Sequence, residues 1–223
     1  MRIIIFANGL IEDPAAETAH WVRPGDKVIT ADGGTRHALD AGIKPAHVIG
    51  DLDSLPPEVR GSLEAQGTLF HPHPPAKDET DLELALLWAS DPPWQDVKEI
   101  VVLGALGGRP DQELANLLLL ALPALAGKRV TIADAAWRIC LIRGGERLHI
   151  HGQPGETLSL IPLGGNAEGI TTENLVYPLK DETLRFGPAR GVSNVLQGTE
   201  AWVRLEKGLL WCFHRRGVEK NAL

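Results

Sequence analysis

The stretch that decides the fold is predicted to change from strand to turn to helix. It comprises the eleven residues His47-Val48-Ile49-Gly50-Asp51-Leu52-Asp53-Ser54-Leu55-Pro56-Pro57. The apolar run at residues 47–49 predicts a short strand, and Gly50 predicts a turn directly after it. Pro57 suits the first position of a helix, where its missing N–H has no partner to lose. The stretch therefore predicts a strand, an acidic turn and a helix in succession.

The same alternation extends outward from this stretch through the first 133 residues. Apolar β-rich runs predict strands at residues 2–7, 27–31, 47–49, 68–71, 99–103 and 129–133. The segments between them predict helices at residues 14–21, 35–41, 57–66, 80–89 and 111–125. Such alternation is typical of an α/β domain with a mainly parallel sheet and helices on its faces.

The pattern changes near Arg138, where helical periodicity gives way to short alternating runs. These runs predict strands at residues 139–143, 147–151, 157–161, 169–176, 183–186, 199–205 and 209–214. Gly, Pro and Asn separate them, as in an antiparallel sandwich or a partly closed barrel. We therefore expect an α/β domain over residues 1–136 and an all-β domain over residues 137–223.

Composition excludes several classes of protein. The chain has 223 residues, 43% of them hydrophobic, and a formal charge of −7. Its apolar runs fall short of the roughly 20 residues that a membrane span needs, and its acidity disfavours a nucleic-acid-binding protein. Two cysteines without a CxxC spacing indicate no disulfide framework, so we expect a cytoplasmic protein.

Turns rich in glycine and polar residues follow several of the predicted strands. They lie at residues 8–9, 32–34, 50–53 and 104–109. The carboxyl ends of parallel strands meet at one edge of the sheet, and ligands of open α/β sheets bind there. These turns are therefore expected to lie close together and to form a ligand site.

Two acidic clusters provide candidate ligands for a divalent metal. Asp51 and Asp53 flank Leu52, and an extended backbone would point both carboxylates to one face. Crowded carboxylates repel each other, and a bound Mg²⁺ would remove that cost and bridge to phosphate oxygens. A solvated turn that caps the next helix explains this pair equally well.

The second cluster, Lys77-Asp78-Glu79-Thr80-Asp81, precedes a predicted helix. Thr80 and Glu83 form a capping-box pattern, and acidic residues at a helix start favour the helix dipole without any metal. Lys77 adds a cation that could neutralise a transferring phosphate. Capping and metal binding both remain open for Asp78 and Asp81.

The segment from Gly104 to Gln112 joins a predicted strand to a predicted helix. Gly107 and Gly108 would let backbone N–H groups approach a phosphate, and Arg109 offers a planar fork for phosphate oxygens. Asp111 could cap the helix or join the metal site. Asn116, among aliphatic residues, is either a satisfied core amide or a site residue.

In this order and spacing, the motifs resemble the thiamine pyrophosphokinase family. The matching segments are Ala31-Asp32-Gly33-Gly34, Gly50-Asp51-Leu52-Asp53-Ser54, Lys77-Asp78-Glu79-Thr80-Asp81-Leu82-Glu83, Gly107-Gly108-Arg109-Pro110-Asp111-Gln112, Leu114-Ala115-Asn116, Leu158-Ser159-Leu160-Ile161-Pro162-Leu163 and Gly191-Val192-Ser193-Asn194. Many bacterial members have His where this chain has Gln112, so the resemblance implies no catalytic histidine here.

The resemblance implies transfer of the pyrophosphoryl group of ATP to the thiamine hydroxyl, giving thiamine diphosphate and AMP. It implies Mg²⁺ as cofactor and a homodimer with its active sites at the subunit interface. The implied metal ligands are Asp51, Asp53 and Asp81, with Asp78, Lys77, Arg109 and Asp111 as further catalytic residues. The implied nucleotide site comprises Asp32, Gly33, Lys77, Thr80, Gly107, Gly108, Arg109, Gln112 and Asn116. Ser193 and Asn194 would bind thiamine.

Three other interpretations compete with this one. The same scaffold could carry a pyrophosphokinase that acts on a pterin alcohol, because only the acceptor pocket would differ. Asp51 could instead be the covalent nucleophile of a phosphatase, with Asp53 as its acid/base partner. A sensor that only binds thiamine or a nucleotide would not need so many carboxylates.

Overall fold

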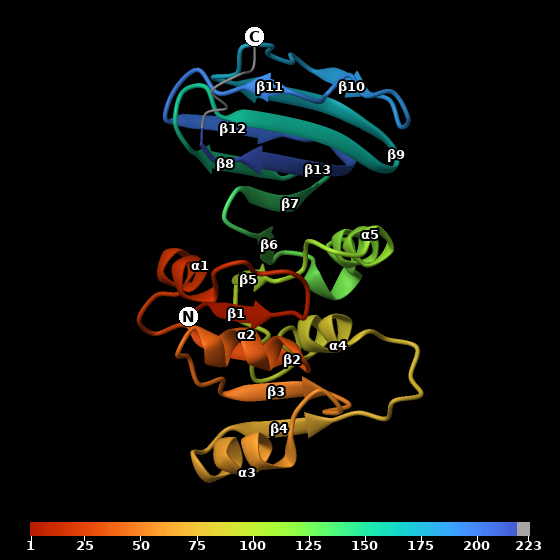
Figure 1. The fold of residues 1–223 in the computed structure, drawn as a ribbon. Coiled ribbons are helices and arrows are strands. Elements are labelled where there is room, and N and C mark those ends of the chain that lie inside the picture. Colours follow the sequence, from red (N-terminus) through yellow and green to blue (C-terminus); the bar gives the residue numbers. More distant parts are fainter. Residues whose placement is uncertain (218–223) are drawn as a thin grey trace. The chain divides into compact units, whose positions relative to one another are not determined.

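The computed structural model describes residues 1–217 and divides after Asp134 into two compact units. The elements of the first unit are β1 (Ile3–Phe6), α1 (Pro14–Trp21), β2 (Lys27–Ala31), α2 (Gly34–Asp40), β3 (His47–Gly50), α3 (Pro57–Ala65), β4 (Leu69–Pro72), α4 (Asp81–Trp88), β5 (Glu99–Leu103), α5 (Pro110–Leu119), the 3₁₀ turn η1 (Pro123–Leu125) and β6 (Arg129–Ala133). Its strands lie in the order β4-β3-β2-β1-β5-β6, and neighbouring strands are parallel (Figure 1). The predicted α/β fold with a parallel sheet is confirmed.

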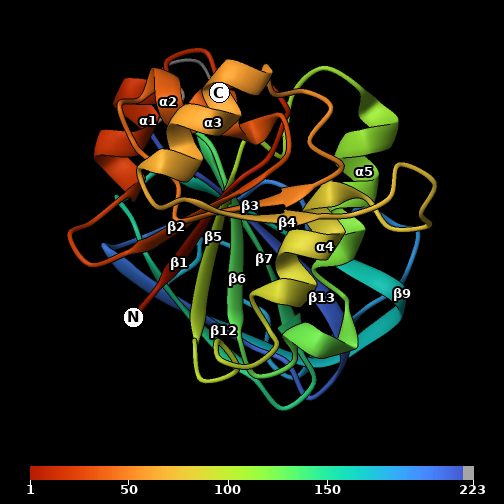
Figure 2. The same cartoon turned by 90° about the horizontal axis from the view of Figure 1, so that it is seen from below.

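The sequence of the strands explains why this sheet is parallel and central. Every residue of β1 and of β3 is buried, and the side chains of β2 and β5 are buried after their first residue. Such continuously apolar strands need cover on both faces. Helices α1, α2 and α3 cover one face, and α4 and α5 cover the other (Figure 2).

The direction of the chain reverses once across this sheet. From β1 to β4 each new strand is added on one side, and α4 then carries the chain back to β5 on the other side of β1. A parallel sheet opens a crevice at such a reversal, outside the carboxyl ends of the two strands concerned. The topology therefore places a crevice beyond the ends of β1 and β5.

Local signals set most helix boundaries in this unit. Asp13 caps α1 by accepting a hydrogen bond from the Ala16 N–H at 3.0 Å, and Thr80 caps α4 by accepting one from the Glu83 N–H at 3.2 Å. The predicted helix over residues 111–125 was too long, because α5 ends at Leu119 and only η1 follows. Leu122 precedes Pro123 and takes an extended ψ of 131°, as residues before proline prefer.

The second unit contains antiparallel strands. They are β7 (Trp137–Arg143), β8 (Arg147–His151), β9 (Thr157–Glu173), β10 (Glu182–Leu184), β11 (Asn194–Val195), β12 (Glu200–Arg204) and β13 (Lys207–Arg215). They pair in the order β7-β13-β9-β12-β8, while β10 and β11 also pair with β9. Leucine, isoleucine and valine side chains from most of these strands form one buried core, which confirms the predicted all-β region.

The long strand β9 differs from the prediction of two separate strands over residues 157–161 and 169–176. Its first part pairs with β13 and its last part with β12, so one strand takes part in both pairings. The short strand β11 was not predicted, because it is only two residues long. Among the described residues, no helix is long and apolar enough to span a membrane.

Candidate active site

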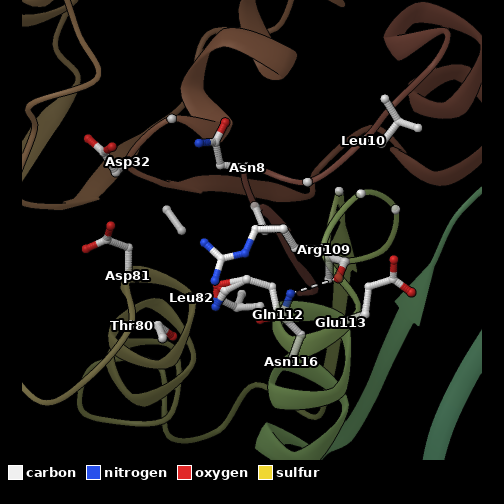
Figure 3. A pocket seen from close by; sticks show the side chains of 18 residues that line it. Asn8, Leu10, Asp32, Thr80, Asp81, Leu82, Arg109, Gln112, Glu113 and Asn116 are labelled. Atoms are coloured by element: carbon white, nitrogen blue, oxygen red, sulfur yellow. Dashed lines mark hydrogen bonds between the residues drawn. The ribbon is translucent and has the colours of Figure 1, made fainter.

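A cavity of about 560 Å³ lies where the chain reversal of the first unit predicts it. Its walls come from the turns after β1, β2 and β5 and from the starts of α4 and α5. Figure 3 shows Asp32 and Asp81 on one side of this cavity, with Arg109 and Gln112 from the β5–α5 connection near its centre. The lining residues are Ala7, Asn8, Gly9, Leu10, Ala31, Asp32, Gly33, Thr80, Asp81, Leu82, Gly104, Ala105, Gly107, Gly108, Arg109, Gln112, Glu113 and Asn116.

Asp32 is a buried acid with an incomplete set of partners. It directly follows β2, has a φ of 36° and is 5% exposed. Its Oδ1 atom is buried and has no hydrogen-bond partner among residues 1–217. Burial raises the pKa of Asp32, and the charges of Asp81, Asp51 and Asp53 raise it further. A hydrogen bond from Ser54 lowers it by less than these effects raise it. Oδ1 of this carboxylate therefore lacks a cation or donor that would stabilise its charge.

Asp32 belongs to a group that we call the carboxylate cluster, formed with Asp51 and Asp53. Each contributes one oxygen, and these oxygens lie within 4.8 Å of one another. The backbone at Leu52 is not extended, because this residue has a left-handed φ of 65°. Leu52 nevertheless packs inward against Val48 and Leu55, so the turn buries its leucine and keeps both acids together.

Lys77 neutralises part of this charge. Its Nζ atom lies 2.9 Å from Asp81 Oδ1 and 3.7 Å from Asp51 Oδ2, and its side chain is 10% exposed. Burial lowers the pKa of Lys77, but the two carboxylates outweigh it and the pKa is raised. The sequence had grouped Asp81 with Asp51 and Asp53, whereas the structure pairs Asp81 with Lys77 and brings Asp32 to the other two acids.

Gly50 makes this crowding of acids sterically possible. It ends β3 with a φ of 145°, and a Cβ atom there would lie 2.8 Å from Asp32 Cβ and 3.0 Å from Asp81 Cγ. Real Cβ contacts are longer than this, so a side chain at position 50 would push the acids apart. The glycine of the acidic turn is therefore required by the side chains around it and by its own backbone.

Oxygen donors at this spacing fit a hard divalent cation. Mg²⁺ is held by one or two carboxylates and completes its coordination with water and phosphate oxygens. The unpartnered oxygen of Asp32 and the clustered oxygens of Asp51 and Asp53 are suitable donors. The residues present therefore fit the metal that the sequence suggests.

Arg109 stands before α5 and forms a bidentate pair with Asp111. Its Nε and Nη2 atoms donate to the Asp111 carboxylate at 3.1 and 2.6 Å, and both side chains are exposed. This pair is the main reason that the pKa of Asp111 falls to about 2. Asp111 thus orients Arg109, which lines the cavity, and does not belong to the carboxylate cluster.

The predicted nucleotide residues converge on the cavity with one exception. Asp32, Gly33, Thr80, Gly107, Gly108, Arg109, Gln112 and Asn116 line it, whereas Lys77 reaches its edge through Asp81. The sequence left Asn116 as either a satisfied amide or a site residue, and both descriptions apply. Its side chain donates to Ala105 O at 2.8 Å, and it lines the cavity. Asp78 is exposed and does not line the cavity.

Sequence reasoning missed the contribution of Asn8 and Leu10. The turn after β1 was expected near the site, but its side chains were not assigned to it. Gly33 lies so close to Asn8 that a Cβ atom would be 2.5 Å from the asparagine amide. A polar residue directly after the first buried strand was the available signal.

Ser193 and Asn194 lie in the second unit and differ in how accessible their side chains are to a ligand. Asn194 is buried, accepts hydrogen bonds from the N–H groups of Tyr177 and Val195, and donates to Tyr177 O. Ser193 is exposed with a φ of 63°, and its N–H donates to Ser159 Oγ. The Ser193 hydroxyl is thus the more accessible of the two groups.

A smaller cavity of about 130 Å³ lies beside this segment. Its lining residues are Leu160, Tyr177, Pro178, Leu179, Arg190, Gly191, Val192 and Asn194. Tyr177 is 66% exposed and Val192 is 43% exposed, so apolar surface is available beside this cavity. The sequence did not single out Tyr177, which lies sixteen positions before Ser193.

Comparison with known proteins assigns both units to one family. The family described as thiamin pyrophosphokinase, catalytic domain, matches residues 19–133, and the family described as thiamin pyrophosphokinase, vitamin B1 binding domain, matches residues 146–210. The chain belongs to the thiamine pyrophosphokinase family. The first match contains the carboxylate cluster, and the second contains Tyr177 and Ser193.

Individual family members cover most of the chain. A Bacillus subtilis protein named thiamine pyrophosphokinase is 31% identical over 182 residues, which are 82% of this chain and 84% of its own. A crystal structure of thiamine pyrophosphokinase from Bacillus subtilis has a TM-score of 0.83 at 28% identity, covering 98% of this chain and 100% of the other. One from Geobacillus thermodenitrificans has a TM-score of 0.82 at 26% identity and covers 100% of both chains.

Proposed function

We propose that this chain catalyses transfer of the pyrophosphoryl group of ATP to the hydroxyl of thiamine, giving thiamine diphosphate and AMP. The observation that carries the proposal is the carboxylate cluster at the edge of the 560 Å³ cavity, in which Asp32 keeps a buried oxygen without a partner. Membership of the thiamine pyrophosphokinase family supports thiamine over a pterin alcohol as acceptor. It also disfavours a phosphatase with Asp51 as nucleophile.

In this proposal Asp32, Asp51 and Asp53 hold Mg²⁺. The ion, when bound, supplies positive charge to the phosphate oxygens of ATP. Lys77 would exchange its contact with Asp81 for a phosphate oxygen, which would make the Asp81 carboxylate available as a further ligand. The 2.9 Å pair between Lys77 and Asp81 places both groups at the cavity edge where this exchange would occur.

The remaining cavity residues would position the nucleotide. Gly107 and Gly108 would present N–H groups to phosphate oxygens ahead of the α5 N-terminus. Arg109, held by Asp111, would bind the phosphates through its planar fork. Thr80, Gln112 and Asn116 would complete the polar wall, and Gly33 would allow close approach beside Asn8.

Catalysis would then rest on position and charge. The thiamine hydroxyl would attack the β-phosphorus in line, and AMP would leave with the electrons of the broken P–O bond. A nearby carboxylate would accept the hydroxyl proton. Arg109 and Lys77 would stabilise the charge that develops on the transferring group.

The acceptor would bind through the second unit. Ser193 would donate to or accept from the aminopyrimidine ring, and Tyr177 would cover the face of that ring. Asn194 would hold the Tyr177 backbone in place through its paired hydrogen bonds. A homodimer with active sites at the subunit interface is part of the proposal.

Product analysis tests the proposal directly. The purified chain would be incubated with Mg-ATP and thiamine, and in parallel with a pterin alcohol, and the products separated by chromatography. Thiamine-dependent AMP and thiamine diphosphate would support the proposal. ADP formed only with thiamine would identify a simple kinase. AMP formed only with the pterin alcohol would identify that alcohol, and not thiamine, as the acceptor.

A further inference from the structure

The two cysteines of the chain are direct partners across the second unit. Cys140 in β7 lies opposite Cys212 in β13 in an antiparallel register. Opposed residues of antiparallel strands point to the same face, with Cα atoms about 4.5–5.5 Å apart. A disulfide needs a Cα separation of about 4.4–6.8 Å, so this register meets the Cα part of its geometry.

Both cysteines are free thiols in this structure. Cys212 is 1% exposed, whereas Cys140 is half-buried at the border of the same core. The hydrogen bond to Cys140 and burial raise the pKa of Cys212. The two thiols therefore differ in access, and a reagent from solvent reaches Cys140 first.

The position of Cys212 limits its possible partners. On its other side β13 faces β9, where Leu160 is the opposed residue. Cys140 is the only other cysteine in the sequence. Because β13 pairs with β7 over seven consecutive residue pairs, the ladder holds the backbones of Cys140 and Cys212 opposite each other.

We propose that Cys140 and Cys212 form a reversible disulfide that links β7 to β13, with a small oxidised disulfide such as glutathione disulfide as the oxidant. The Cys140 thiolate attacks one glutathione sulfur, forms a mixed disulfide and releases one glutathione thiolate, which takes up a proton. Cys212 then loses its proton, attacks Cys140 Sγ and releases the second glutathione. Both protein thiols are oxidised, and one glutathione disulfide is reduced to two glutathione molecules.

The expected product is an intramolecular link with a measurable effect on stability. Intact-mass analysis of the full chain after incubation with glutathione disulfide should show a loss of about 2 Da that dithiothreitol reverses. Peptide mapping should join the Cys140 peptide to the Cys212 peptide. The thermal midpoint of the oxidised protein should rise by about 5 °C, because the link restricts the unfolded chain.

Single-cysteine variants separate the roles of the two thiols. Cys212→Ala should stop at the mixed disulfide and gain about 305 Da, because the attacking thiol is present and the resolving thiol is absent. Cys140→Ser should stay unmodified while folded, because Cys212 is buried. Circular dichroism would verify that each variant is folded, and the wild-type measurement stands without them.

Two outcomes would overturn the proposal. One is a folded wild-type protein that keeps its reduced mass under conditions in which the urea-unfolded chain becomes oxidised. The other is oxidation that gives only chains linked to each other or a persistent glutathione adduct. Either result would mean that the opposed thiols cannot reach disulfide geometry within the native sheet.

Discussion

Strand β3 and helix α4 each have a group of acidic side chains at one end and a group of histidine and tryptophan side chains at the other. The two groups differ in whether their titratable side chains find partners within the protein. At one end, Asp51 follows β3 and Asp81 begins α4. At the other end, His47 begins β3 and Trp88 ends α4, and with His71 and Trp94 they form what we call the histidine cluster. The same two elements thus support both groups.

The two histidines of this cluster pair with each other, although Trp94 Nε1 has no hydrogen-bond partner among the described residues. His47 Nδ1 and His71 Nε2 are 3.0 Å apart and share a hydrogen bond, and Trp88 packs against both rings at centroid distances of 4.5 and 5.1 Å. Burial, with the charges of His71 and Lys27, lowers the pKa of His47 to about 4, so its ring is neutral near pH 7. The carboxylate cluster instead keeps repelling charges and an unpartnered oxygen. A buried carboxylate that lacks internal partners indicates a ligand, whereas a neutral, paired histidine indicates structure.

The largest expected effect comes from the carboxylate cluster. Asp51→Asn and Asp53→Asn should each lower kcat by about 10²–10³-fold, because each removes a preorganised charge from the proposed metal site. The fold should persist, since neither side chain belongs to the apolar core. Steady-state kinetics with circular dichroism would measure both properties.

Glu79→Gln is the matched control for these substitutions. Glu79 is an exposed acid in the loop between Lys77 and Asp81 and does not line the cavity. Its variant should keep near-normal turnover. A double variant of Asp51 and Asp53 with near-normal activity would contradict the metal assignment and remove the contrast between the two clusters.

Gly50→Ala should produce the next largest effect. The added Cβ would meet Asp32 and Asp81 at 2.8 and 3.0 Å, so stability should fall by about 1–3 kcal/mol and turnover should fall with it. Gly61→Ala in α3 is the control, because a Cβ there would meet no atom within 4 Å in the described part of the chain, and alanine favours helix. Urea unfolding would compare the two, and equal stabilities would show that the acids tolerate more space than we infer.

The stability that the histidine cluster contributes should fall as the pH falls. A salt bridge that needs a charged histidine would instead contribute more stability at lower pH. The folded pKa of His47 lies below its ordinary value of 6.5, so the unfolded chain binds the proton more readily as pH falls. Stability should therefore be lost between pH 6.5 and about 4, by on the order of 2–3 kcal/mol. His71 and Lys27 face the ring and oppose its protonation.

His47→Phe isolates this contribution, because phenylalanine keeps the ring packing and cannot take up a proton. Urea unfolding from pH 7 to pH 4 should show a shallower loss of stability for this variant than for the wild type. His149→Phe, at an exposed position, should leave the slope unchanged. Identical slopes for the wild type and His47→Phe would show that His47 is not held neutral.

The smallest effect concerns the second unit. Ser193 there is exposed and available to a ligand, whereas Asn194 is buried and paired within the protein. Ser193→Ala should raise the KM for thiamine several-fold, about 1 kcal/mol of binding, with little change in the KM for ATP. Asn194→Ala should mainly destabilise the protein, because it removes three hydrogen bonds from a buried amide. Equal changes in both KM values for Ser193→Ala would argue against a thiamine contact.

The sequence predicted the strands of the first unit well, because buried parallel strands and Gly-rich turns leave strong local signals. Strands β2, β5 and β6 of this unit occupy the predicted residues, as does β8 of the second unit. The continuous path of β9 and the two residues of β11 could not be predicted, since both depend on which strands pair in space. The end of α5 was predictable in principle from Pro123, which the apolar run around it obscured.

The candidate site shows the same limit. Motifs identified the acids, but which acids share a ligand depends on the three-dimensional position of Lys77, which neutralises Asp81 and leaves Asp32 with Asp51 and Asp53. The left-handed backbone of Leu52 was likewise invisible, because the sequence shows only an apolar residue between two acids. Residue types predicted an acidic site, and packing decided which acids lie together.

Leu52 has a further consequence for dynamics. Its side chain is buried with Val48 and Leu55, while the residues on either side belong to the carboxylate cluster. A cation held by those two acids would bind only the closed form of this turn, so it would slow local opening of the backbone. Amide hydrogen exchange at residues 52–55 should therefore slow as Mg²⁺ is added, and it would report occupancy without nucleotide, thiamine or turnover.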